Sequence, residues 1–354
     1  MSSRREFLRV AGAAGAYAMT RGAAGLRGQT PRRQVTIGGR RVRVIDAHAH
    51  CVIPVQDIVK GTPLEKMGGG GGNNLLGPER LRIMDQQGVD LQALTINNFW
   101  YYAADPDLAR KIVLAQNEGL AKWVAAHPDR FVAIASVALP HPELAAEQLQ
   151  DGVKRLGLRG ASIGGHVNGE DLSLPKYDPF WAKAAELGVP VFMHPAGAEN
   201  IVKEGALRGR GELGNIIGNP LETTYFLSRM IFDGVFDKFP GLRVFAAHAG
   251  GYLPSYLGRT EAACEFRGNA NCANKRKPSE ILKSQIVIDT MVFSDEGLRH
   301  LVAEAGVGQV VYGTDVPFNW PVTVDLVLNA KFLTDTDKEL ILSGNLRKLL
   351  RIGS

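Results

Sequence analysis

Five residues of the chain have the types and the spacing that metal or proton-transfer chemistry needs. His48 and His50 close the apolar run Val-Ile-Asp-Ala-His-Ala-His. Side chains two apart on a strand point to the same side, so the two imidazoles can converge on one ion. His194 and His248 each end another apolar run, and Asp315 follows a further one. Imidazoles and a carboxylate suit a divalent ion such as Zn²⁺, so we predict a metal site.

The elements that must position these residues are short runs rich in Val, Ile, Ala and Phe. Several are continuous rather than alternating, which is typical of parallel strands buried on both faces. Eight such runs predict eight strands, at Val42–Asp46, Leu91–Ile96, Phe131–Ser136, Gly160–Ile163, Val189–His194, Leu242–His248, Ile286–Asp289 and Gln309–Gly313.

Amphipathic stretches separate the predicted strands. We expect helices at Pro142–Arg155, Asp178–Leu187, Glu222–Phe232 and Ser294–Ala305, and a last helix that opens with a capping box at Thr336–Glu339. Strands that alternate with helices eight times predict an α/β fold, a (β/α)₈ TIM-like barrel. The alternative is an open doubly wound sheet, but no Gly-x-Gly-x-x-Gly follows the first strand. In a barrel, all five candidate residues lie at the C-terminal rim, where the active sites of this fold are built.

Composition limits the class of protein. The chain has 354 residues, of which 45% are hydrophobic and 22% charged, as in ordinary globular proteins. No apolar run approaches the length of about 18 residues that a membrane-spanning helix needs. The net charge is +5, but residues 1–33 hold seven Arg and one Glu, which leaves a slightly acidic remainder. A nucleic-acid partner is therefore not expected, because it needs a basic surface on the folded domain.

The first 33 residues form a basic leader. They contain Ser-Arg-Arg-Glu-Phe-Leu-Arg at residues 3–9, followed by a mildly apolar stretch at Val10–Met19. This pattern resembles a twin-arginine secretion signal, whereas the alternative is a disordered basic tail. We expect residues 1–33 to be the signal and linker and residues 34–354 to be the metal-dependent barrel domain. The twin-arginine translocase would then export the protein to the periplasm, and without a functional leader the protein would be cytoplasmic.

Three cysteines are too few for a disulfide framework in a chain of this size. Cys264 and Cys272 could pair in an oxidising compartment or remain two free thiols, and the sequence leaves both possibilities open. Cys51 follows the His-x-His motif and is expected to be a small core residue. Asp289 ends the seventh predicted strand, where it could serve the site or make a structural hydrogen bond.

The motifs around the candidate residues carry a resemblance. They are His-x-His at 48–50, His-Pro at 194–195, His-x-Gly-Gly at 248–251 and Gly-Thr-Asp-x-Pro-Phe at 313–318. In this order they resemble amidohydrolase family 2 of the metal-dependent hydrolases, and within it aminocarboxymuconate semialdehyde decarboxylase and related non-oxidative decarboxylases. The likeness runs from about Val44 to Leu350 and includes residues 84–89, 163–168, 220–224 and 234–240.

The resemblance implies a role for each candidate. His48, His50, His194 and Asp315 match the ligands of one divalent ion, most often Zn²⁺, with Mn²⁺ as a possibility. His248 matches a histidine that is not a ligand but activates metal-bound water, a role that suits an imidazole because it titrates near neutral pH. His248 and Asp315 are therefore the expected catalytic residues.

Two further residues are expected to bind the substrate. Arg259 matches an arginine that grips a substrate carboxylate in the neighbouring subunit's site, which implies a homodimer. A guanidinium holds a carboxylate in a bidentate fork, although an Arg on a helix is usually a solvated surface group. His166 ends the fourth predicted strand inside a matched motif and is expected to line the pocket.

Three classes of function are consistent with these residues. The favoured one is a metal-dependent carboxy-lyase that decarboxylates a small, aromatic or unsaturated carboxylic acid without oxidation. The alternative is a metal-dependent hydrolase of an ester, lactone or amide, which would use the same ligands. A barrel without activity is least favoured, because no ligand position is missing. The carboxylate clamp expected at Arg259 separates the lyase from the hydrolase.

Overall fold

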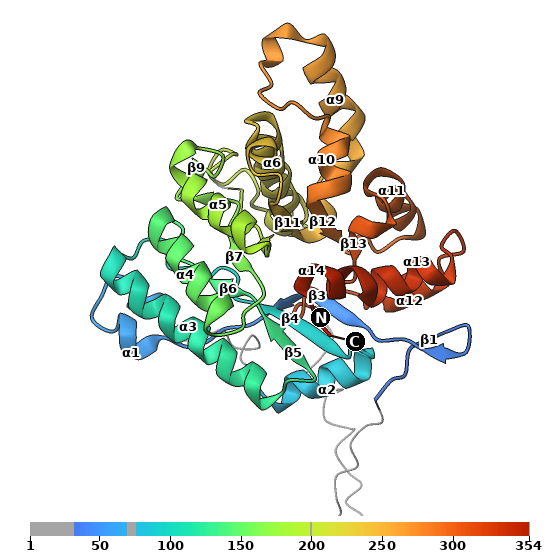
Figure 1. Cartoon of the computed structure of the whole chain (residues 1–354), viewed down its shortest axis with the longest axis horizontal. Coiled ribbons are helices and arrows are strands. Elements are labelled where there is room, and N and C mark those ends of the chain that lie inside the picture. The colour runs from blue at the N-terminus through green and yellow to red at the C-terminus, as the bar shows by residue number, and fades with distance from the viewer. Residues whose placement is uncertain (1–31, 69–75, 199, 354) are drawn as a thin grey trace, which may run out of the picture.

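The computed structural model describes residues 32–68, 76–198 and 200–353. Its centre is a ring of short parallel strands surrounded by helices (Figure 1). All eight predicted strands are present, and β5 and β6 together form the third. The strands of the ring are β3 (Ile45–His50), β4 (Leu91–Thr95), β5 (Phe131–Ala133), β6 (Ala135–Ser136), β7 (Ala161–Ile163), β10 (Pro190–Met193), β11 (Arg243–Ala246), β12 (Ile286–Asp289) and β13 (Val310–Val311).

The ring closes between its first and last strands. Strands β3, β4 and β5 pair in parallel, and so do β6, β7, β10, β11, β12 and β13 in that order. Strands β5 and β6 are consecutive and link the two sets. At the other junction, Ala47 N donates to Tyr312 O at 2.9 Å and Asp315 N donates to His48 O at 2.9 Å. The predicted (β/α)₈ barrel is confirmed, and the open doubly wound sheet is wrong.

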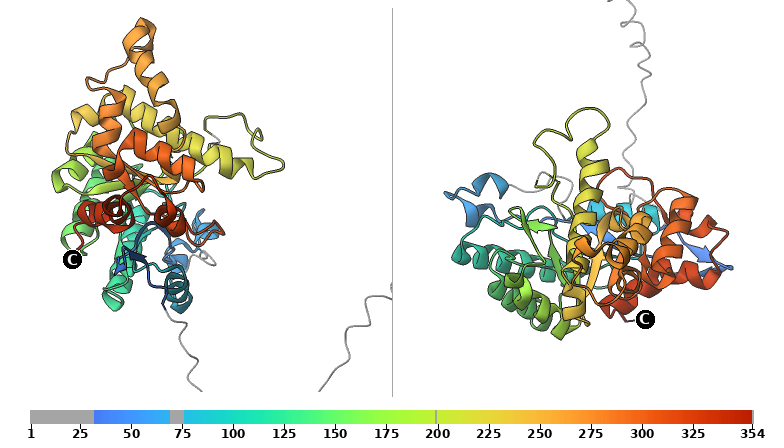
Figure 2. Two further views of the ribbon diagram at one scale, coloured as in Figure 1. Left: turned by 90° about the vertical axis from the view of Figure 1, so that its right-hand side faces the viewer. Right: turned by 90° about the horizontal axis from the view of Figure 1, so that it is seen from above.

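Helices cover the outside of the ring, as the views in Figures 1 and 2 show. The longest, α3, follows β4 and carries an Asp105 N-cap that accepts from the backbone amides of Asp107 and Leu108. The helices are α1 (Gln56–Val59), α2 (Pro78–Gln87), α3 (Pro106–Ala126), α4 (Pro142–Lys154), α5 (Asp178–Leu187), α6 (Asn219–Phe232), α7 (Val235–Lys238), α8 (Ala247–Gly250), α9 (Leu257–Phe266), α10 (Pro278–Gln285), α11 (Asp295–Ala305), α12 (Val324–Asn329), α13 (Asp335–Glu339) and α14 (Asn345–Leu350). Two short hairpins, β1 (Thr36–Ile37) with β2 (Arg40–Arg41) and β8 (His166–Val167) with β9 (Glu170–Asp171), lie outside the ring.

Apolar side chains fill the barrel beneath the histidines. Phe192 and Phe245 stack with ring centroids 4.6 Å apart. They belong to one buried cluster with Ile45 of β3 and with Leu346 and Leu350 of α14. The last helix therefore packs against the barrel interior. The interior below the site is a packed core, which leaves the C-terminal rim as the place for chemistry.

The predicted positions of the capping box and of His248 need correction. The capping box lies at Thr334 and Asp337, not at Thr336–Glu339: Thr334 Oγ1 accepts from Asp337 N, and Asp337 Oδ2 accepts from Thr334 N. Both placements fit the box pattern, but only the earlier one lies at the start of α13. The sixth strand ends at Ala246, so His248 lies in the short segment α8 that follows it, which turns there because the backbone of His248 and Ala249 is left-handed rather than helical.

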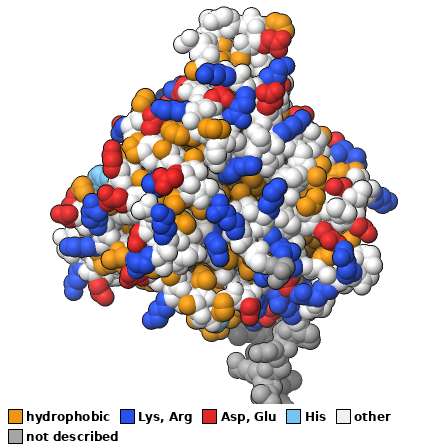
Figure 3. All heavy atoms as spheres, viewed as in Figure 1, with side chains coloured by type: hydrophobic (Ala, Val, Ile, Leu, Met, Phe, Trp, Pro, Cys, Tyr) orange, Lys and Arg blue, Asp and Glu red, His pale blue; other side chains and the backbone are white. Residues whose placement is uncertain are grey.

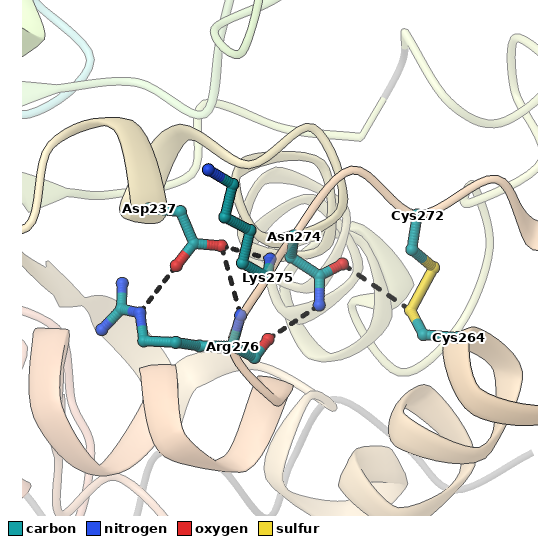
Figure 4. The surroundings of a disulfide bond; sticks show 6 residues. All are labelled: Asp237, Cys264, Cys272, Asn274, Lys275 and Arg276. Carbon is teal, nitrogen blue, oxygen red and sulfur yellow. Dashed lines mark hydrogen bonds and ion pairs between the residues drawn. A yellow bond between two sulfur atoms is a disulfide. The ribbon is translucent and has the colours of Figure 1, made fainter.

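Helices α9 and α10 and the segment between them form an arm that projects from the barrel (Figure 1). Within it, Cys264 and Cys272 form a disulfide with Cα atoms 5.7 Å apart. Beyond the disulfide, Asp237 of α7 accepts hydrogen bonds from Lys275 N and from Arg276 Nε, each at 2.6 Å (Figure 4). The arm is thus fastened both internally and to the body of the barrel. The free cysteine, Cys51, is buried, as expected.

The surface mixes charges of both signs. In the face shown in Figure 3, Lys and Arg side chains are interspersed with Asp and Glu. None of the helices in the described ranges is long and apolar enough to cross a membrane. The expected twin-arginine motif and apolar stretch, at residues 3–19, lie outside the described residues.

Candidate metal centre

The predicted site residues come together at the C-terminal ends of the strands. His48, His194, His248 and Asp315 each offer one ligand atom, and these atoms all lie within 4.8 Å of one another. His48, His194 and Asp315 are buried, whereas His248 is half-buried. They come from β3, from the residue after β10, from the turn after β11 and from the segment after β13.

His50 lies directly beside these four residues. Its Nε2 is 2.8 Å from Asp315 Oδ1, and its ring lies edge-on to His194 with centroids 4.6 Å apart. The ring of His50 also stacks on that of His48 at 5.3 Å. The structure therefore gathers all five residues that the sequence singled out, and we call them the metal group.

The free nitrogen atoms of the metal group fit a cation. Nε2 of His194 is buried without a hydrogen-bond partner. Nε2 of His48 is also buried and lies 3.1 Å from Asp315 Oδ1. The other nitrogen of each ring is engaged, since His48 Nδ1 lies 2.8 Å from Asp289 Oδ2 and His194 Nδ1 lies 2.8 Å from Pro195 O. When Nδ1 donates its proton to such an acceptor, Nε2 keeps a lone pair. Unpartnered buried polar atoms are costly, and a divalent ion would satisfy them.

The protonation of the metal group follows from burial and from one central carboxylate. Burial lowers the pKa of His50 to about 4 and the pKa of His194 well below its usual value, which keeps both imidazoles neutral, as ligands must be. Burial also acts to lower the pKa of His48, but Asp315 and Asp289 outweigh it and raise that pKa to about 10, so an ion that binds His48 Nε2 would displace a proton from this imidazole. Burial acts to raise the pKa of Asp315, but the facing His48 imidazole and the neighbouring His248 and His50 lower it. The carboxylate thus stays ionised and attracts positive charge to the centre.

Local backbone irregularities aim the side chains. The pairing of β3 with β4 shifts register between Asp46 and Ala49, and a β-bulge of this kind re-aims the side chains that follow it. His248 and Asp315 adopt left-handed backbone conformations, with φ values of 54° and 56°. Such conformations cost energy in residues other than glycine and cluster at functional sites. Sequence patterns indicated which residues meet but not these conformations.

His166 lies in hairpin β8–β9 rather than at the end of β7. Its Nδ1 accepts from Gly169 N at 3.0 Å, and its Nε2 lies 4.0 Å from Glu222 Oε1. Glu222 is buried and accepts from the backbone amides of Gly165, at 3.0 Å, and Ala196, at 2.9 Å. This carboxylate joins the loop after β7 to the loop after His194. The sequence placed Glu222 in a matched motif without assigning it a role.

Arg259 lies on α9, in the projecting arm, and is exposed. No hydrogen bond or ion pair within the described part of the chain joins it to the metal group.

Three further residues contact the side chains of the metal group. Asp289 contacts His48 as described above, so its hydrogen bond reaches the metal group. Asn97 Nδ2 lies 3.5 Å from His50 Nδ1, and Trp320 Nε1 donates to Asp315 Oδ2 at 3.0 Å. The sequence did not predict a role for Asn97 or Trp320. Spacing in a sequence does not show which loop residues contact the metal group.

Comparison with known proteins agrees with this architecture. The family model described as Amidohydrolase matches residues 45–352. The chain belongs to this amidohydrolase family. The 2-amino-3-carboxymuconate-6-semialdehyde decarboxylase of Dictyostelium discoideum is 33% identical to this family member over 276 residues, which are 77% of this chain and 75% of that one.

Solved structures of decarboxylases are also similar. The 5-carboxyvanillate decarboxylase of Sphingomonas paucimobilis superposes with a TM-score of 0.78 at 26% identity, covering 88% of this chain and 100% of that one. The dihydroxybenzoic acid decarboxylase of Polaromonas sp. JS666, with bound manganese and 2-nitroresorcinol, has a TM-score of 0.74 at 26% identity, covering 88% and 97%. These relatives confirm the expected family and the expected class of enzyme, a metal-dependent carboxy-lyase of the amidohydrolase superfamily.

Proposed function

We propose that this amidohydrolase decarboxylates a small, planar carboxylic acid, aromatic or unsaturated, at the metal group. The observation that carries the proposal is the buried, unpartnered Nε2 of His194 together with the buried Nε2 of His48, which lies 3.1 Å from the ionised Asp315 carboxylate at the barrel rim. The names of the three relatives support the substrate class, since each is a decarboxylase of a muconate semialdehyde, a vanillate or a dihydroxybenzoate.

One divalent ion is the proposed cofactor, held by His48, His50, His194 and Asp315. Three imidazoles and one carboxylate are a donor set that suits Zn²⁺, which is our first choice. Mn²⁺ is the second choice, because the Polaromonas relative holds manganese. When bound, the ion would act as a Lewis acid on an oxygen of the substrate or of a water molecule.

His248 is the proposed proton carrier. Its Nε2 lies 3.6 Å from Asp315 Oδ2, and it is the most exposed histidine of the four that gather around Asp315 in the metal group. In the reaction, the carbon that bears the carboxylate gains a proton, the bond to the carboxylate breaks, and its electron pair returns to the unsaturated system as CO₂ leaves. An imidazole can deliver and take back such a proton near neutral pH.

Aromatic side chains beside the metal group favour a planar substrate. The half-exposed ring of Phe318 lies edge-on to His50 with centroids 5.1 Å apart. Phe293 and Trp320 stack nearby, with centroids 5.1 Å apart and ring planes 21° apart. Rings of this kind pack well against a flat unsaturated acid.

The hydrolase alternative would gain support if His248 were a ligand. His248 belongs to the set of residues whose ligand atoms lie within 4.8 Å of one another, so its geometry permits coordination. A second ion could then be held, and the chemistry would resemble that of a binuclear hydrolase.

The deciding experiment incubates metal-loaded protein with hydroxybenzoates and muconate-type acids while CO₂ is measured. We expect CO₂ release from at least one acid and, in D₂O, deuterium at the carbon that lost the carboxylate. His248→Ala should keep its metal and lose on the order of 10² to 10⁴ in rate. His300→Ala, on α11, is the matched control and should keep both. Ester, lactone or amide cleavage without CO₂ release from any acid would favour the hydrolase.

We further propose a homodimer in which Arg259 serves the neighbouring site. The support is its exposure on the projecting arm and its lack of a contact with the metal group of its own chain. Arg259→Ala and His248→Ala should each be inactive alone. Mixed after subunit exchange, they should recover about a quarter of the activity, because half of the dimers are mixed and each has one complete site. No recovery in proven mixed dimers would contradict the shared site.

Export by the twin-arginine translocase remains a proposal that rests on the leader sequence. Replacing Arg4 and Arg5 with Lys should leave the protein in the cytoplasm, whereas the unchanged chain should reach the periplasm. Equal export of both chains would show that the leader is not a twin-arginine signal.

A further inference from the structure

We propose that Trp320 is a positioning residue that orients the Asp315 carboxylate toward the ligand imidazoles. The inference rests on the proposed metal centre and adds a residue that the ligand motifs do not contain. It concerns the indole N–H of Trp320, which donates to Asp315 Oδ2 at 3.0 Å.

The two oxygens of Asp315 have different neighbours. Oδ1 faces the imidazoles, 3.1 Å from His48 Nε2 and 2.8 Å from His50 Nε2. Oδ2 faces the indole of Trp320 at 3.0 Å and His248 Nε2 at 3.6 Å. Only the indole is within hydrogen-bond range of Oδ2 in this pair. The carboxylate is therefore held by one oxygen and presents the other.

Contacts of its ring and of its backbone hold Trp320 in place. Its ring stacks on Phe293 with centroids 5.1 Å apart, and its backbone N–H donates to Phe318 O at 2.9 Å. The same turn is closed by Phe318 N, which donates to Asp315 O at 3.1 Å. Asp315 and Trp320 thus lie on one short turn, five residues apart. The conformation of this turn therefore determines the directions of both the indole N–H and the carboxylate.

Loss of the indole N–H would leave Oδ2 with a poor partner. Asp315 is only 2% exposed, so water cannot readily replace the donor. The carboxylate could then rotate, or His248 could close the 3.6 Å gap to Oδ2. In either case the ligand set would be less well ordered before an ion binds. Outer partners of metal ligands typically contribute 10- to 100-fold to metal affinity.

The test replaces the N–H alone. Site-specific incorporation of β-(3-benzothienyl)alanine at position 320 keeps the ring and its stacking but puts sulfur in place of N–H. Zn²⁺ and Mn²⁺ affinities are measured on the full chain by competition with a chromogenic chelator. We expect a roughly 10- to 100-fold weaker affinity, with the melting temperature of the metal-free protein nearly unchanged.

Trp181 provides the matched control. Its indole N–H also donates to one acceptor, Leu172 O at 2.9 Å, but in the buried core of α5. The same replacement there should leave metal affinity unchanged. Trp320→Phe is the second variant, which keeps an aromatic ring and should weaken affinity in the same direction.

The outcomes separate the two proposals. Unchanged or tighter metal binding by both position-320 variants, with normal binding by the unaltered chain, overturns the role of Trp320 alone. Equal weakening by the Trp181 replacement also overturns it, because the effect would then be structural. A chain that binds neither ion before any substitution overturns the metal centre, and the inference with it.

Discussion

Asp289 holds His48 from behind the metal group. The carboxylate Oδ2 of Asp289 lies 2.8 Å from Nδ1 of His48, and both side chains are buried. Asp289 Oδ2 also accepts from His248 N at 3.1 Å, and Oδ1 accepts from Ala249 N at 2.8 Å. One side chain at the end of β12 therefore fixes His48 on β3 and the strained turn after β11.

We expect Asp289→Asn to weaken metal binding by roughly 10- to 100-fold. In either orientation of the amide, its NH₂ group replaces one carboxylate oxygen and faces a donor, either Ala249 N or the pair of His48 Nδ1 and His248 N, so these contacts cannot all be kept. Zn²⁺ titration against a competing chelator measures the loss.

The control for this variant is Asp237→Asn, on the arm side of the molecule. Asp237 also accepts from side chain and backbone, at Arg276 Nε and Lys275 N, but contacts no member of the metal group. The metal affinity of the Asp237→Asn variant should equal that of the unaltered chain. Weakening of the same size in both variants would mean that Asp289 acts through global stability.

Replacing His50 and replacing His248 should have different effects on the metal content of the protein. His50→Ala should lose most of its bound metal, because His50 Nε2 faces Asp315 Oδ1 at 2.8 Å inside the ligand set. His248→Ala should retain the metal, as a proton carrier would. Elemental analysis after dialysis decides between them. Full metal occupancy in His50→Ala would contradict the role of His50 as a ligand. A metal-free site in His248→Ala would indicate that His248 is a ligand instead.

The sequence predicted the barrel because its strands are continuous apolar runs between amphipathic helices. The predicted residues of the metal group also meet, because each lies at or just beyond the C-terminal end of a strand. The first strand was placed too early, at Val42–Asp46 rather than Ile45–His50. The polar residues of this strand, Asp46, His48 and His50, resemble the end of a strand in a hydropathy pattern, but all three are buried.

The contacts that orient the ligands could not be predicted in the same way. His48 and Asp289 are 241 residues apart, and only the closed ring brings them together. Trp320 faces Asp315 because the turn between them bends back, which depends on a left-handed backbone at Asp315. The Cys264–Cys272 disulfide depends on the geometry of the arm, so the sequence left the pairing open.

The attachment of the arm should depend on pH. Burial acts to raise the pKa of Asp237, but the hydrogen bonds from Arg276 and Lys275 outweigh it and lower that pKa. A carboxylate with a depressed folded-state pKa stabilises the fold above its unfolded pKa, and this contribution disappears as the pH falls through the lower folded value. Asp237→Asn should therefore cost about 1 kcal/mol at neutral pH and progressively less in acid. Urea unfolding of the unaltered chain and of Asp237→Asn between pH 7 and pH 3 measures the difference in their free energies of unfolding. A difference that does not shrink in acid would contradict the ionic attachment.

The disulfide of the arm gives a direct prediction for proteolysis. Arg267 is exposed and lies between Cys264 and Cys272, which are eight residues apart in the sequence. Trypsin cleavage after Arg267 should leave the two fragments joined on a non-reducing gel and separate on a reducing gel. Cys272→Ser should give separate fragments on both gels and faster cleavage, because a loop of this length contributes about 2 kcal/mol when it is closed by a disulfide. Its metal affinity should stay that of the unaltered chain, since the arm and the metal group are fastened by different contacts. Separate fragments from the unaltered chain on the non-reducing gel would show that the two cysteines are free thiols.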